Sequence, residues 1–118
     1  MTRLKIYIAG PVTEGDRLNN FMQACIAQRD LMSCGHAPFN PILSIMHPDA
    51  LAIPYESWIE TDLAWVAVAD VVLRLPGKSR GADREVEFAK NNNIPVLDYL
   101  HDKWATICDI NREMKLKE

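Results

Sequence analysis

The chain has 118 residues, of which 48% are hydrophobic and 25% are charged, and its formal net charge at pH 7 is −3. This length suits one domain with one hydrophobic core, and the mild acidity gives no basis for binding nucleic acid through its phosphates. Cys25, Cys34 and Cys108 stand at irregular spacing, which argues against a disulfide framework and for a cytoplasmic protein. No run of about eighteen apolar residues is present, so no membrane-spanning segment is expected.

The first third of the chain predicts two strands joined by a helix. Residues 4–9 (LKIYIA) are rich in β-forming side chains and end at a Gly-Pro pair, which predicts a strand. Apolar residues then recur at helical spacing between Asp16, a suitable N-cap, and Gly35, a suitable stop. A short second strand is expected over residues 36–40.

The rest of the chain alternates helices with strands after a proline-rich segment, residues 41–54, which favours an irregular loop with at most one helical turn. Helices are expected over residues 55–69, 82–92 and 101–117, and strands over residues 71–75 and 94–97. This alternation predicts a single α/β domain over residues 1–118, a three-layer sandwich with a mainly parallel sheet of the flavodoxin-like or Rossmann-like type. Ligands of such folds bind at the carboxyl ends of the strands, so the loops after residues 9 and 75 are the candidate site.

Asp62 stands on the face of a predicted helix that should pack inward. Its neighbours one turn away in each direction are all apolar, namely Trp58, Ile59, Trp65 and Val66. A buried carboxylate costs several kcal/mol unless it is paired or protonated, so this placement is informative. Either Asp62 belongs to a functional site or it is a structural or partly exposed aspartate.

The predicted helix over residues 82–92 carries three acids in different surroundings. Glu87 has polar and charged neighbours and should face solvent, whereas Glu85 has small or apolar neighbours and should face packed or concave surface. Asp83 lies in the first turn, where a carboxylate interacts favourably with the helix dipole. Glu85 and Asp62 therefore form a pair of acids at one sheet edge, as glycosyl chemistry requires.

The tripeptide Gly-Lys-Ser that ends at Ser79 lacks the upstream glycine of a P-loop, because Val72 stands there in a predicted strand. Ser79, Gly81 and the N–H groups that begin the next helix can instead bind an anion. Lys78 and Arg80 would add positive charge. The alternative is a plain glycine turn.

In order and spacing these pieces resemble the nucleoside 2-deoxyribosyltransferase superfamily, including the 2′-deoxynucleoside 5′-phosphate N-hydrolases and small phage-encoded members. The first strand and turn, residues 7–11 (YIAGP), resemble the family's strand whose glycine, here Gly10, lies beside the sugar. Residues 58–63 (WIETDL) resemble the helix that carries an acid. The pattern Ser79-x-Gly81-x-x-x-Glu85 matches the phosphate loop and catalytic glutamate of the N-hydrolases.

The resemblance implies that Glu85 attacks the anomeric carbon, that Tyr7 orients Glu85 through its hydroxyl, and that Asp62 binds the sugar or protonates the departing base. Ser79 between Lys78 and Arg80 favours a 5′-phosphate, whereas transferases acting on free nucleosides place an acid there. We therefore expect hydrolysis of a nucleoside 5′-monophosphate. No metal or other cofactor is expected, since the histidines lack ligand spacing.

Two other functions stay open at this point. One is transfer of deoxyribose between bases, and the other is a non-catalytic nucleotide-binding module, since a fold and an anion loop do not establish turnover. The expected partners are a small nucleotide or nucleoside and further copies of the chain, with no nucleic acid and no membrane. The resemblance places the protein in the cytoplasm of a bacterial or phage-infected cell.

Overall fold

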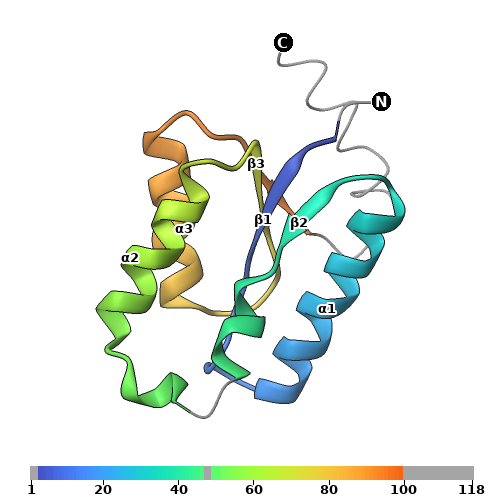
Figure 1. Cartoon of the computed structure of the whole chain (residues 1–118). Coiled ribbons are helices and arrows are strands. Elements are labelled where there is room, and N and C mark those ends of the chain that lie inside the picture. Colours follow the sequence, from blue (N-terminus) through green and yellow to red (C-terminus); the bar gives the residue numbers. More distant parts are fainter. Residues whose placement is uncertain (1–2, 47–48, 100–118) are drawn as a thin grey trace.

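The computed structural model describes residues 3–46 and 49–99, which form a three-layer α/β sandwich (Figure 1). Its strands are β1 (Lys5–Ala9), β2 (Ala37–Phe39), β3 (Val71–Arg74) and β4 (Val96–Asp98). All pairings are parallel and the order is β2-β1-β3-β4, as in flavodoxin-like folds. The strand order reverses between β1 and β3, so the crevice beyond their carboxyl ends is the place where this fold binds ligands.

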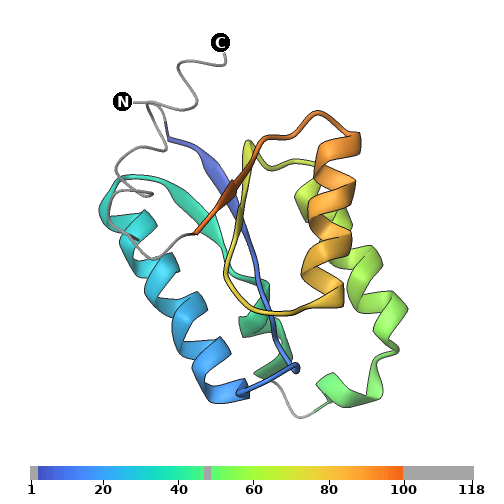
Figure 2. The same ribbon diagram turned by 180° about the vertical axis from the view of Figure 1, so that it is seen from behind.

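The helices cover both faces of the sheet. Helix α1 (Arg17–Ser33) lies on one face, and α2 (Tyr55–Val66) and α3 (Arg80–Asn91) lie on the other, as Figures 1 and 2 show from opposite sides. Within the described ranges, no helix combines the length and the apolarity that crossing a membrane would require. The predicted three-layer α/β fold is confirmed.

The central strand β1 is buried on both faces, because α1 packs on one and α2 and α3 on the other. Side chains alternate along a strand, so Ile6 and Ile8 join the core beneath α1, whereas Tyr7 and Ala9 join the core beneath α2 and α3. The same alternation is seen in β3. Tyr7 is thereby directed toward the face that carries Glu85.

The ends of the helices agree with the sequence pattern. Asp16 caps α1 by accepting a hydrogen bond from the N–H of Asn19 at 3.1 Å, and Gly35 follows the helix with a φ of 87°. Ser79 caps α3 by accepting from the N–H of Ala82 at 3.1 Å. Helix α3 therefore begins two residues earlier than predicted.

Two further expectations need correction. Residues 41–54 were predicted to contain at most one helical turn, but they contain two 3₁₀ segments, Pro41–Met46 and Ala50–Ala52. A short 3₁₀ turn tolerates proline at its first position, because the N–H there needs no partner within the turn. Helix α2 ends at Val66 instead of residue 69, since Asp70 already pairs with Lys5 of β1 through backbone and side-chain hydrogen bonds. The helix predicted over residues 101–117 lies outside the described residues.

Candidate active site

Tyr7 and Glu85 meet in the layer between the sheet and α3. The Tyr7 hydroxyl donates a hydrogen bond to Glu85 Oε2, and both side chains are buried. Glu85 points inward because it shares the inner face of α3 with Ala82 and Ala89. The sequence predicted this orientation, whereas the contact with Tyr7 came from the family resemblance.

Asp62 is the third ionisable group at this position. It is half-buried on α2, and burial raises its pKa to about 6. Its charge also raises the pKa of both Tyr7 and Glu85, so the three groups share one electrostatic environment. The structure therefore brings together the two acids and the tyrosine that the sequence singled out.

The pKa of Glu85 is raised to about 8, mainly by burial and further by the charge of Asp62. The hydrogen bond from Tyr7 and the charge of Arg74 act in the opposite direction and lower it. The pKa of Tyr7 is raised strongly by its own burial, so its hydroxyl stays protonated as a donor. Glu85 thus exchanges a proton near neutral pH, which suits a group that must ionise to react.

Aromatic rings support Tyr7 from the side of β2. The Tyr7 ring stacks on Phe39 at a centroid distance of 5.8 Å, and Phe39 stacks on Trp65 at 5.1 Å. The expectation that Trp65 is on an inward-packing stripe is wrong, since this side chain is 50% exposed. The Trp65 ring stacks on Phe39 of β2, which is the short strand at the edge of the described sheet. One side of the ring is therefore not covered by the sheet.

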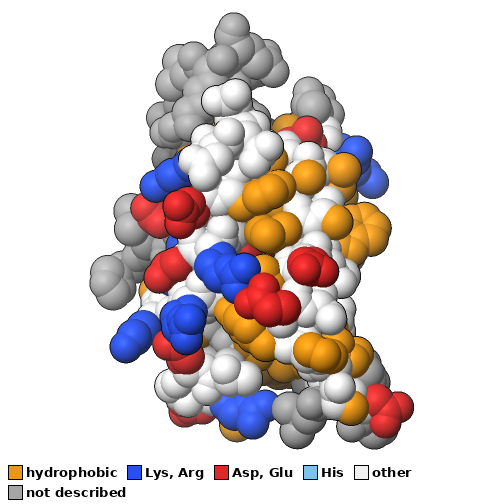
Figure 3. All heavy atoms as spheres, turned by 90° about the vertical axis from the view of Figure 1, so that its left-hand side faces the viewer, with side chains coloured by type: hydrophobic (Ala, Val, Ile, Leu, Met, Phe, Trp, Pro, Cys, Tyr) orange, Lys and Arg blue, Asp and Glu red, His pale blue; other side chains and the backbone are white. Residues whose placement is uncertain are grey.

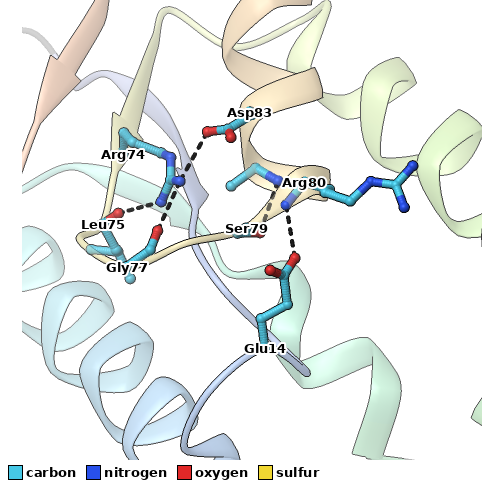
Figure 4. A network of polar contacts seen from close by, with 8 residues as sticks. Glu14, Arg74, Leu75, Gly77, Ser79, Arg80 and Asp83 are labelled. Atoms are coloured by element: carbon cyan, nitrogen blue, oxygen red, sulfur yellow. Dashed lines mark hydrogen bonds and ion pairs between the residues drawn. The ribbon is translucent and has the colours of Figure 1, made fainter.

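The N-terminus of α3 is already occupied by a carboxylate from another loop. Glu14 Oε1 accepts a hydrogen bond from the N–H of Arg80 at 2.9 Å, and the Ser79 hydroxyl serves as the N-cap (Figure 4). Lys78 and the side chain of Arg80 are exposed, and the latter points away from Glu14 (Figure 4). The residues predicted to form an anion loop lie at the start of α3, and the sequence pattern did not indicate that Glu14 would reach them.

Glycines allow the two loops at this edge to pack closely. A Cβ on Gly10 would lie 3.0 Å from Leu75, and one on Gly77, whose φ is 112°, would lie 3.0 Å from Pro11. Gly81 is less constrained, since its nearest neighbours lie at 3.6 Å. The proposed sugar contact of Gly10 therefore coincides with a structural need for glycine there.

Arg74 was not predicted as part of the site. Its guanidinium donates to the carbonyls of Leu75 and Gly77, the latter at 2.9 Å, and pairs with Asp83 at 3.0 Å (Figure 4). The sequence did contain one signal for Arg74, because it is a cation at the carboxyl end of a predicted strand, where ligands of this fold bind. Asp83 lies in the first turn of α3, as expected, and Glu87 faces solvent, as expected.

Described residues line a cavity near the aromatic stack and a larger hollow on α1. A cavity of about 210 Å³ adjoins the aromatic stack, and its lining includes Tyr7, Phe39 and Trp65. A larger, open hollow of about 450 Å³ is lined by residues of α1, which lies on the other face of the sheet from α3 (Figure 1). The smaller cavity shares Tyr7 with the candidate site, but Glu85 and Asp62 do not line it. Among the described residues, His, Cys, Asp and Glu side chains form no cluster of three that could hold a metal ion.

Comparison with protein families finds a match to a family described as a domain of unknown function, DUF4406, over residues 4–98. The match spans every described strand and helix. No curated protein sequence matches the chain.

Solved structures show the same fold. A 2-deoxyribosyltransferase from Bacillus psychrosaccharolyticus, described as a biocatalyst for nucleoside synthesis, matches with a TM-score of 0.61 and 24% identity over 83% of this chain and 74% of that one. A conserved protein from Enterococcus faecalis matches with a TM-score of 0.65 and 21% identity over 93% of this chain and 76% of the other. The resemblance to the deoxyribosyltransferase superfamily is thus confirmed at the level of the fold.

Proposed function

We propose that this chain, which belongs to the DUF4406 family, is an N-glycosidase that hydrolyses the N-glycosidic bond of a (2′-deoxy)nucleoside 5′-monophosphate. The observation that carries the proposal is the buried Glu85 that accepts a hydrogen bond from Tyr7, with Asp62 beside them. Within the described residues Tyr7 is the side-chain donor to this buried carboxyl, and strongly perturbed carboxyls of this kind cluster at functional sites. The deoxyribosyltransferase fold, which the chain shares, agrees with chemistry at a nucleoside glycosidic bond.

In the first step, a carboxylate oxygen of Glu85 attacks the anomeric carbon and forms a glycosyl ester. The bond between that carbon and the base nitrogen breaks, and its electron pair stays with the base. Asp62 donates a proton to the departing base, for which its raised pKa of about 6 is suitable. The Tyr7 hydroxyl holds the attacking carboxylate in place.

In the second step, water attacks the anomeric carbon and displaces Glu85, which leaves as a free carboxylate. Asp62, now ionised, accepts the proton of that water and returns to its starting form. The net reaction converts nucleotide and water into free base and sugar phosphate. These steps use no metal ion and no other cofactor.

The anion loop supports the 5′-phosphate as part of the substrate. Ser79 and Gly81 begin a helix of twelve residues, whose positive end favours an anion, and Lys78 is exposed beside it. A phosphate that approached the N–H of Arg80 would have to displace the Glu14 carboxylate. The loop therefore favours a phosphate only when Glu14 moves.

The position of Glu14 also favours a second candidate, the transfer of deoxyribose between bases on unphosphorylated nucleosides. A carboxylate at the start of α3 repels a phosphate, and it can accept a hydrogen bond from a free 5′-hydroxyl. In that case a second base, not water, would resolve the glycosyl ester. The two candidates differ in substrate charge and in acceptor, so they are separable by experiment.

We also propose that the protein acts in the cytoplasm as a homo-oligomer. Figure 3 shows apolar side chains gathered on the face formed by α2 and α3, next to charged ones. Large apolar residues that are exposed on or directly after α2 are Tyr55, Trp65 and Val68. A second copy would cover such a surface, and light scattering at several protein concentrations tests this.

Chromatographic detection of free base tests the proposed function. Deoxy- and ribonucleoside 5′-monophosphates and the matching nucleosides are incubated with wild type, Glu85→Gln and Glu87→Gln. Both variants lie on α3, but Glu85 is buried and Glu87 faces solvent. We expect base release that the first change abolishes and the second preserves. No release from any substrate by folded wild type would refute an N-glycosidase and leave a nucleotide-binding module, which calorimetric titration with the same compounds would detect.

A further inference from the structure

The guanidinium of Arg74 joins the loop that follows β3 to the first turn of α3. It donates to the carbonyl of Leu75, to the carbonyl of Gly77 at 2.9 Å, and to Asp83 Oδ1 at 3.0 Å. The side chain is only 14% exposed, although Asp83 is 71% exposed. Figure 4 shows it lying between the turn that follows β3 and the first turn of α3.

These contacts fix where α3 begins. The loop of residues 75–79 ends at Ser79, the N-cap of the helix, so a hold on its carbonyls sets the position of that cap. Asp83 is in the first turn, and Glu85 follows it two residues later, at the start of the second turn. A shift of the loop would therefore move Glu85 relative to Tyr7, which is anchored in the rigid central strand.

The charge of Arg74 also reaches the candidate nucleophile. The groups that act on Glu85 come from three elements: Tyr7 on β1, Asp62 on α2 and Arg74 on β3. Asp62 raises the pKa of Glu85, whereas Tyr7 and Arg74 lower it. The arginine therefore counteracts the effects of burial and of the second acid.

We propose that Arg74 is a positioning residue of the active site, which clamps loop 75–79 to the first turn of α3 and holds Glu85 against Tyr7. This inference rests on the proposed function, in which Glu85 is the nucleophile. It assigns two separable tasks to one side chain. The fork of hydrogen bonds sets geometry, and the positive charge favours the ionised form of Glu85.

The variants Arg74→Lys and Arg74→Gln separate these tasks. Lysine keeps the charge but lacks the planar fork, and glutamine loses both. The control is Arg84→Gln, which removes another guanidinium from α3, one that pairs with Glu56 on the surface. The measurements are kcat and KM for base release, the ¹³C NMR titration of the Glu85 carboxyl, and amide hydrogen exchange over residues 75–79.

We expect Arg74→Lys to lower kcat by about tenfold or more, because small misplacements of a reacting group are costly, while Glu85 titrates close to wild type. We expect Arg74→Gln to lower kcat further and to raise the pKa of Glu85 by about half a unit or more. Both variants should speed amide exchange in the loop, and Arg84→Gln should change none of these quantities. Wild-type kcat and wild-type titration in Arg74→Gln would overturn the proposal.

The proposal and the proposed function can fail separately. If folded wild type releases no base, the function is refuted, and the titration and the amide exchange still decide whether Arg74 sets the state of Glu85. If the Arg74 variants do not fold, Asp83→Ala removes one arm of the clamp at an exposed position. Faster loop exchange in that variant supports the clamp, and unchanged exchange overturns it.

Discussion

The hydroxyl of Tyr7 on β1 donates a hydrogen bond to the carboxyl of Glu85 on α3. The two residues are 78 positions apart in the sequence. Both groups are buried, and the charges of Asp62 and Arg74 act on Glu85 in opposite directions. The proposed reaction requires Glu85 to ionise and then to attack a carbon. Changes at Tyr7 and Glu85 therefore test both the hydrogen bond in the structure and the proposed reaction.

Replacing Tyr7 by Phe removes the only side-chain donor that is seen on Glu85 within the described residues. Because this hydrogen bond lowers the pKa of Glu85, its loss should raise that pKa and reduce the ionised fraction at pH 7. We expect kcat to fall by about tenfold or more, since one pKa unit is a factor of ten in that fraction. Base-release kinetics measure the fall. Tyr55→Phe, at an exposed position, is the control, and an equal loss in both variants would contradict the assignment.

Glu85→Gln should change how stability depends on pH. The folded-state pKa of Glu85 is raised from 4.5 to about 8, so the folded state holds its proton more tightly than the unfolded chain. The stabilisation of the folded state by this tighter proton binding is complete below about pH 4.5 and is lost as pH rises through about 8. Glutamine cannot ionise and does not lose this stabilisation. Between pH 5 and pH 9 the free energy of unfolding of the variant should therefore rise, relative to that of wild type, by more than about 1 kcal/mol. Urea unfolding at both pH values measures this, with Glu87→Gln expected to show no such gain.

The pH profile of kcat/KM should report both acids. The reactive form has Glu85 ionised and Asp62 protonated, and their pKa values are about 8 and about 6. We expect activity to rise up to about pH 6, to stay level, and to fall above about pH 8. In Asp62→Asn no proton remains to be lost at high pH, so the fall should disappear while the overall rate drops. A fall above pH 8 that survives in Asp62→Asn would exclude Asp62 as the proton donor.

Glu14→Gln should separate phosphorylated from unphosphorylated substrates. The change keeps the size of the side chain but removes the negative charge that accepts from the N–H of Arg80. A phosphate would then meet less repulsion, and we expect kcat/KM for 5′-monophosphates to rise by about tenfold, with no such rise for nucleosides. Paired kinetics on a nucleoside and its monophosphate measure the ratio. The same change for both substrates would show that Glu14 does not discriminate between them.

The order and the class of the elements followed from the sequence. Strand β1 and helix α1 were predicted to within a residue or two, since apolar periodicity, the Asp16 cap and Gly35 are local signals. The inward orientation of Glu85 and the outward orientation of Glu87 followed from their helical neighbours, because helix geometry places residues one turn apart on the same face.

The contacts between distant segments were decided by the tertiary structure. The pairing of Glu14 with Arg80, the clamp formed by Arg74 and the exposure of Trp65 depend on how loops and edges meet, and no periodicity encodes such meetings. The perturbed pKa values of Glu85 and Asp62 have the same origin, since burial and neighbouring charge exist only after packing. Local sequence thus determined which residues face the interior, and three-dimensional packing determined which of them meet, because side-chain direction is a property of one element and proximity is a property of several.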